Sequence, residues 1–165
     1  MGMDLEGRGG YFRFSNTSWY KVLELAYEYG WKPAGTEPGR WVDPSTGELD
    51  EQLSPDPDEW DGDYFGNCFQ WVTDEDATRI ADALERALDA IPNFDAAEKW
   101  VEYGPTDIGP TNMPMGPVER SLVEEGFAVS VPNGSLSPQE YFSGEDKPLV
   151  RAFIAYCRAG EFYIG

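Results

Sequence analysis

The chain has 165 residues, of which 41% are hydrophobic and 15% aromatic, and its 31 acidic and 12 basic side chains give a formal net charge of -19. This length and apolar content suit one domain with a core that needs neither disulfides nor metals, which excludes intrinsic disorder. The negative charge repels phosphates and anionic lipid head groups, so we expect no nucleic-acid and no membrane partner.

The first predicted elements are a short strand and a helix. Residues 11–14 are aromatic and β-favouring and predict a strand. A helix is predicted from about 19 to 29, with its cap among residues 16–18. Residues 31–36 predict a second strand, which Pro33 confines to a sheet edge because proline lacks the ladder donor.

Residues 37–63, called the acidic segment, differ in composition from the rest of the chain. Ten acidic residues and one basic residue, Arg40, give the segment a local net charge of -9 (1 minus 10). A loop of this length is usually functional or disordered, but tryptophans are costly to expose, so we expect it to pack at least in part. The candidate partner-binding residues are Trp41, Asp43, Asp56, Asp58, Glu59, Trp60, Asp61, Asp63 and Tyr64.

The most regular stretch, residues 73–88, predicts a helix that packs on the core. Residues 64–65 and 69–72 predict the strand before it, with a turn or bulge at 66–67. Thr73 caps this helix, and Asp76 stands three residues on in the spacing of a capping box. Apolar residues then recur at steps of three and four, which defines one buried stripe. The stripe comprises Ala77, Ile80, Ala81, Leu84, Ala87, Leu88 and Ile91.

The following third of the chain alternates short elements with a long connection. A short helix is predicted over 95–101, and the four prolines of residues 104–117 exclude regular structure there. A second short helix is predicted over 118–125, and the alternation in 127–131 predicts a half-buried strand.

The C-terminal elements are a helix that begins between residues 143 and 148 and runs to 159, and a strand over 162–164. Strands and helices interleave along the whole chain. We therefore predict a single α+β domain, residues 1–165, with a small mixed or antiparallel sheet covered by about three main helices.

The chain lacks the residues that several kinds of catalysis and metal binding require. The chain has no histidine, which excludes Ser-His-Asp and Cys-His catalysis and His-ligated zinc. No glycine loop has the Walker or dinucleotide pattern, so we expect no cofactor. The acidic run does not fit an EF-hand, because Gly62 at position six would put Pro57 first and Cys68 twelfth. An irregular calcium site is the remaining alternative to a solvated acidic loop.

The two cysteines, Cys68 and Cys157, are far apart and each has apolar neighbours, which predicts two buried free thiols. Residues 1–10 contain no apolar run, and no stretch approaches the roughly 20 apolar residues of a membrane span. We therefore expect a cytoplasmic protein.

Three sets of segments form one combined pattern: 11–14 with 23–26 and 29–36, then 72–77 with 84–88, and finally 153–162. Together they resemble a group of small acidic bacterial proteins known only as hypothetical proteins. The shared motifs are ones of packing and capping, so the resemblance implies a bacterial cytosolic protein and no catalytic residue.

The function hypothesis from the sequence is a non-enzymatic acidic module that offers residues 37–63 to a basic partner protein. Immunity-type and inhibitor proteins are similar in size, acidity and lack of catalytic motifs. The alternative is a hydrolase, for example one acting on a carbohydrate, that uses a carboxylate pair in an aromatic-lined cleft. A DNA-mimicking inhibitor fits less well, because the acids cluster among prolines. The sequence leaves the oligomeric state open.

Overall fold

The computed structural model describes residues 2–39, 42–50, 56, 58, 60, 62–67, 69–96, 100–103, 129–132 and 136–165. Its elements are β1 (Gly2–Gly7), β2 (Gly10–Ser15), α1 (Asn16–Glu28), β3 (Gln70–Val72), α2 (Asp74–Ala87), η2 (Leu88–Ala90), β4 (Trp100–Tyr103), β5 (Val129–Pro132), α4 (Pro138–Tyr141), η3 (Gly144–Asp146), α5 (Lys147–Arg158) and β6 (Phe162–Ile164). Contacts divide the chain into two compact units, Met1–Asp89 with Pro148–Gly165, and Ala90–Lys147. A compact unit need not be a domain, so the single-domain prediction stays a prediction.

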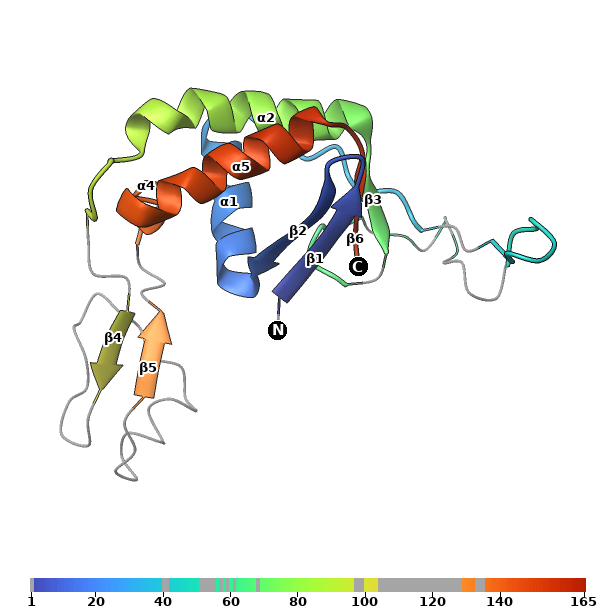
Figure 1. Ribbon diagram of the computed structural model, residues 1–165, viewed down its shortest axis with the longest axis horizontal. Coiled ribbons are helices and arrows are strands. Elements are labelled where there is room, and N and C mark those ends of the chain that lie inside the picture. The colour runs from blue at the N-terminus through green and yellow to red at the C-terminus, as the bar shows by residue number, and fades with distance from the viewer. Residues whose placement is uncertain are drawn as a thin grey trace. The chain divides into compact units, whose positions relative to one another are not determined.

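The first unit is built on a four-stranded antiparallel sheet with the strand order β2-β1-β6-β3. Figure 1 shows α2 and α5 running beside each other along this sheet, and ion pairs from Arg158 to Asp82 and Glu85 join the two helices. The predicted α+β class is confirmed, with an antiparallel sheet and, in the described part of the chain, three main helices, α1, α2 and α5.

The core lies between these helices and one face of the sheet. Phe153 of α5 occupies its centre, with ring centroids 4.9 Å from Phe14 and 5.9 Å from Trp19. Side chains on a strand alternate between faces, so every second strand residue reaches this core. The residues of this inner face that are at most 1% exposed include Leu5, Phe14, Val72, Phe162 and Ile164.

Most strongly patterned elements lie where the sequence predicts them. The strand over 11–14, the helix over 19–29 and the strand over 162–164 appear as β2, α1 and β6. The helix predicted over 73–88 is α2, and the Thr73 side chain accepts a hydrogen bond from Asp76 N, as expected for its cap. Amphipathic periodicity and capping are local signals, which explains this agreement.

Three predictions about short elements are wrong, and one strand, β1, was not predicted. Residues 64–65 form no strand, since Tyr64 has φ 67°. β1 was not expected because its glycine-rich sequence has little strand propensity, yet it is a central strand paired with β2 and β6. Residues 31–36 form no strand, since Pro33 lacks a donor and Gly35 has φ 90°. No helix occurs in the described part of 95–101, where Trp100 and Val101 belong to β4.

The second unit contains the antiparallel pair β4 and β5, in which Val101 lies opposite Val131. The short helix α4 was not predicted, although Ser137 caps it by accepting from Glu140 N. Lys147 is buried, and its Nζ donates to Ile91 O at 2.7 Å. The connection predicted over 104–117 and the helix predicted over 118–125 lie outside the described residues.

Replacement of Thr73 tests whether the N-cap of α2 contributes to stability. We expect Thr73→Ala to lower the free energy of unfolding by about 1 kcal/mol, because Asp76 N loses its acceptor. Urea unfolding followed by circular dichroism measures this. Thr78→Ala, on the exposed side of the same helix, is the control and should change stability little; equal losses in both variants would contradict the capping role.

The burial of Cys157 leads to a second prediction, which concerns the reactivity of its thiol. The thiol is free and fully buried, as expected from the sequence, and burial raises its pKa. Because the thiolate is the nucleophile, a Cys68→Ser variant should not react with Ellman's reagent at pH 8 while folded and should release one equivalent in denaturant. Rapid labelling of the folded protein would contradict this; Cys68 itself lies outside the described residues.

Candidate functional site

A buried carboxylate organises the site. Asp76, in the first turn of α2, has no exposed surface. Its Oδ1 accepts from Trp31 Nε1 at 2.9 Å, and its Oδ2 accepts from the hydroxyl of Tyr64 at 2.6 Å. The side chain therefore turns into the core, whereas a capping box would direct it back to Thr73.

Every polar atom of Tyr64 forms a hydrogen bond. Its N–H donates to Gln70 Oε1 at 3.1 Å, and its carbonyl accepts from Trp19 Nε1 at 2.9 Å. Its hydroxyl also accepts from Gly35 N at 2.8 Å. Burial and the bond to Asp76 raise the pKa of this phenol, which keeps it a hydrogen-bond donor. These bonds hold Tyr64 at φ 67°, a strained conformation for an aromatic residue.

Gln70 and Thr36 fix both ends of the acidic segment. Gln70 Oε1 accepts from Thr36 Oγ1, and Gln70 Nε2 donates to Gly66 O at 2.7 Å. Trp60 Nε1 donates to Thr36 O at 2.8 Å. Among the described residues, no buried side-chain nitrogen or oxygen lacks a hydrogen-bond partner. These hydrogen bonds attach described residues at both ends of the acidic segment to the core.

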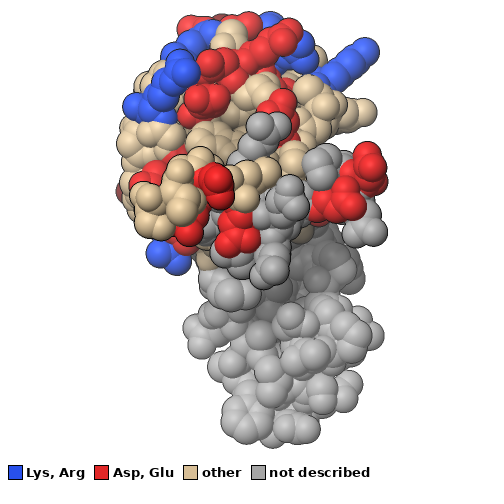
Figure 2. All heavy atoms as spheres, turned by 90° about the vertical axis from the view of Figure 1, so that its right-hand side faces the viewer, with Lys and Arg blue, Asp and Glu red and all other residues tan. Residues whose placement is uncertain are grey.

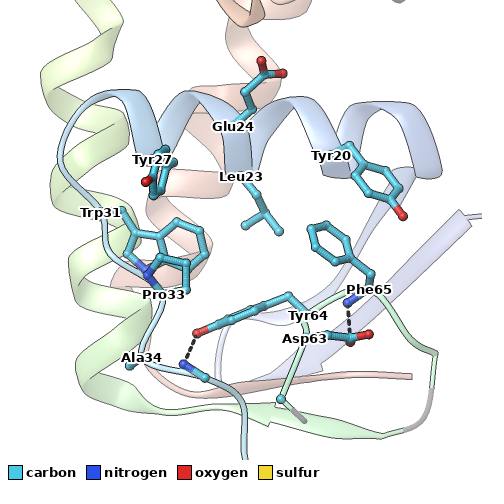
Figure 3. Close-up of a pocket in the computed structure, with 12 residues that line it drawn as sticks. Tyr20, Leu23, Glu24, Tyr27, Trp31, Pro33, Ala34, Asp63, Tyr64 and Phe65 are labelled. Atoms are coloured by element: carbon cyan, nitrogen blue, oxygen red, sulfur yellow. Dashed lines mark hydrogen bonds between the residues drawn. The ribbon is translucent and has the colours of Figure 1, made fainter.

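A pocket of about 710 Å³ opens beside this network, between α1 and residues 31–35 and 62–65. Figure 3 shows Trp31 and Tyr27 on one side of it and Tyr20 with Phe65 on the other. Its lining residues are Tyr20, Leu23, Glu24, Tyr27, Trp31, Pro33, Ala34, Gly35, Gly62, Asp63, Tyr64 and Phe65. An aromatic-lined hollow of this volume is of the size that holds a small ligand or a side chain of a partner.

The aromatic walls of the pocket are packed in pairs. Tyr20 and Phe65 are stacked, with centroids 4.5 Å apart and an interplanar angle of 7°. Trp31 and Tyr64 form an edge contact at 5.3 Å. Tyr20 is nevertheless 55% exposed and Phe65 is 41% exposed. The stacked pair therefore keeps a large aromatic surface in contact with solvent.

Two carboxylates, from Glu24 and Asp63, belong to the pocket lining. Glu24 pairs with Lys21 at 3.3 Å, and Figure 3 shows its carboxylate pointing away from the pocket. Hydrogen bonds from Phe65 N above all, and from Gly66 N, lower the pKa of Asp63. Asp63 is therefore a stable anion at neutral pH.

The predicted partner-binding residues separate into three groups. Asp43, Asp56, Asp58 and Asp63 are exposed. Trp60 is half-buried, and Tyr64, only 3% exposed, is part of the core and of the pocket wall. The remaining predicted residues, Trp41, Glu59 and Asp61, lie outside the described residues.

The sequence interpretation missed the α1 side of the pocket. Tyr20 and Tyr27 lie seven residues apart on one helix face, outside the buried stripe of α1, and both are more than half exposed. Two aromatic residues on the polar face of an amphipathic helix are the signal that would have indicated a binding surface.

Comparisons with family models, curated proteins and solved structures found no match. The resemblance to small acidic bacterial proteins therefore stays a prediction. Within the described part of the chain, none of the helices has the length and hydrophobicity that a transmembrane span requires.

Truncation of the buried carboxylate tests the network. We expect Asp76→Ala to lower the free energy of unfolding by about 3 kcal/mol or more, because Trp31 and Tyr64 lose a charged acceptor. Tyr64→Phe removes one hydroxyl and should cost about 1 to 3 kcal/mol. Tyr20→Phe, with its ring in the same pocket but exposed, is the control and should stay within about 0.5 kcal/mol. Chemical denaturation measures all three; a tolerated Asp76→Ala would show that the network does not organise the fold.

Proposed function

We propose that this protein is a non-enzymatic, acidic protein-binding module of the immunity-protein or inhibitor type, which recognises a basic partner protein. One observation carries the proposal: exposed carboxylates of the acidic segment bond to groups of their own loop. Asp43 accepts from Ser45 N at 2.7 Å and from its hydroxyl, and Asp56 accepts from Asp58 N at 3.0 Å. Such bonds orient a carboxylate without neutralising it, which leaves its charge for a partner.

The basic side chains support the same proposal. In the described part of the chain, five basic residues form ion pairs with acids that lie outside residues 37–63. These basic residues are Arg8, Arg13, Lys21, Arg79 and Arg158. In Figure 2, basic and acidic groups lie together in the upper part of the view, whereas acidic groups predominate lower on the same face. The uneven distribution favours docking of a positive surface.

Attachment of the segment at both ends adds a kinetic advantage. Thr36 and Trp60 are bonded to each other, and Tyr64 is locked to the core. A charged loop that is partly ordered before binding loses less conformational entropy on association. Long-range attraction then raises the association rate, and this effect weakens as salt screens the charges.

The hydrolase alternative has less support. A carboxylate pair for acid-base hydrolysis needs one member with a raised pKa, facing the other across the bound substrate. The pKa of Asp63 is lowered, and Glu24 is paired with Lys21 and points away from the pocket. The aromatic pocket is therefore better suited to holding an anchor residue than to breaking a bond.

The proposal is tested with a partner captured from the source cell, identified by mass spectrometry and then purified. A variant with Asp43, Asp56 and Asp58 replaced by Asn should associate with it about 10-fold more slowly at low salt, and the salt dependence of the rate should decrease. Stopped-flow fluorescence over a salt series measures both quantities.

The matched control removes the same number of charges at exposed positions outside the acidic segment, with Glu28→Gln, Asp89→Asn and Glu145→Gln. We expect its association rate to change less than threefold. If the segment variant and the control associate alike, or if every captured partner is acidic, the proposed function is wrong.

A further inference from the structure

The face of the four-stranded sheet opposite the core carries one continuous row of side chains. Glu6 on β1 lies opposite Tyr11 on β2 and opposite Tyr163 on β6. Tyr163 lies opposite Trp71 on β3, and Glu37 forms an antiparallel bridge with Trp71 through N–H···O bonds of 2.8 and 2.7 Å. Residues directly opposite in antiparallel strands share a face. The cross-strand row is therefore Tyr11, Glu6, Tyr163, Trp71 and Glu37.

This row points away from the core, because the strand residues that alternate with it are buried. Tyr11 is 61% exposed, and both glutamates are exposed. Tyr163 and Trp71 are half-buried. The row is also continuous with the acidic segment, since Glu37 is the first residue of that segment.

An aromatic platform lies between the two glutamates. The rings of Tyr163 and Trp71 meet edge to face, with centroids 5.1 Å apart. Phe69, which is 41% exposed, lies beside them with its centroid 6.0 Å from that of Tyr163. Aromatic faces attract Lys and Arg side chains and also pack against their aliphatic stems. The platform therefore suits a chain segment that carries both charge and apolar surface.

The charges around the row favour a basic ligand. The hydroxyl of Tyr163 donates to Glu6 Oε2 at 2.5 Å, which orients this carboxylate and leaves acceptor sites on it. On the same sheet face, Arg13 is held by Asp4 at 3.6 Å, and Arg8 forms two ion pairs with other acids. Among the described residues, no basic side chain forms an ion pair with either glutamate of the row.

We propose that the cross-strand row binds an extended basic segment of the partner protein, with one cation on Glu6 and a second on Glu37. The inference rests on the proposed function and names the part of the partner that docks. Three strand spacings of about 4.8 Å separate the two glutamates, or about 14 Å in total. In an extended peptide, side chains i and i+4 are also about 14 Å apart and share one face. The segment therefore carries Lys or Arg at i and i+4 and an apolar or aromatic residue at i+2, over Tyr163 and Trp71.

A second copy of this chain does not fit the same face. Two copies would bring two acidic rows together, and each chain carries a net charge of -19. Like charges that face each other oppose association. A basic segment carries the opposite charge and is therefore attracted to the same row.

The proposed spacing of the two cations, at i and i+4 of the bound segment, is tested on the full chain with two peptides of identical composition. One contains the sequence Lys-Ala-Tyr-Ala-Lys and the other Lys-Lys-Ala-Tyr-Ala, each flanked by glycine and blocked at both ends. In an NMR titration of backbone amides, we expect the first peptide to bind at least about fivefold more tightly and to shift amides of β1, β3 and β6. Equal affinity of the two peptides would overturn the proposed spacing.

Variants that remove the charges of Glu6 and Glu37 test whether these two residues bind the cations. Glu6→Gln with Glu37→Gln should weaken binding of the first peptide by about 10-fold, because both cations lose their counter-charge. Gln can still accept the bond from Tyr163, so the fold should be retained, and an unchanged thermal unfolding curve checks this. Glu28→Gln with Glu145→Gln is the matched control and should leave the affinity unchanged; equal weakening by both pairs would refute the site.

The same glutamate variant is then measured against the purified partner. A slower association in the acidic-segment variant, with no effect of Glu6→Gln and Glu37→Gln on the affinity, would refute the inference and leave the proposed function in place. No effect of either variant on partner binding would refute both. A loss of affinity in the glutamate variant, reproduced by the partner's basic segment as a peptide, is the expected result.

Discussion

A buried carboxylate must be hydrogen-bonded, and in this protein that requirement determines how three distant parts of the chain meet. Asp76 has no exposed surface, so the free energy of its desolvation is offset only if donors reach both oxygens. Trp31 and Tyr64 supply these donors from segments that precede α2. The end of the acidic segment, the turn after α1 and the start of α2 are thereby fixed to one another.

This arrangement combines a hydrogen-bonded interior with a charged exterior. Polar bonds to Gln70 and Thr36 continue the network to the beginning and the end of the acidic segment. Within the acidic segment, Asp43 and Asp56 are exposed and accept hydrogen bonds from groups of their own loop. The chain thus has an ordered support for a highly negative surface, which is the physical basis of the proposed binding module.

Sequence patterns predicted the elements whose signals are local. The capped and periodic α2, the aromatic β2 and the apolar face of α5 are examples, because each residue type there agrees with the structure it forms. β1 was missed because pairing on both sides, rather than propensity, stabilises a strand with glycine at each end. The sequence predicts Tyr64 as a partner-binding residue, since nothing in its neighbours indicates that Asp76, twelve residues on, accepts from its hydroxyl.

Composition and short-range periodicity are enough to predict the α+β class, the large negative charge, its concentration in residues 37–63 and the lack of histidine chemistry. Three features appear only in the folded chain: Asp76 faces inward, Tyr20 and Phe65 form one wall of a pocket, and Glu6, Tyr163, Trp71 and Glu37 share a row. The physical reason is that strand register and the satisfaction of buried polar groups depend on contacts between residues far apart in the chain.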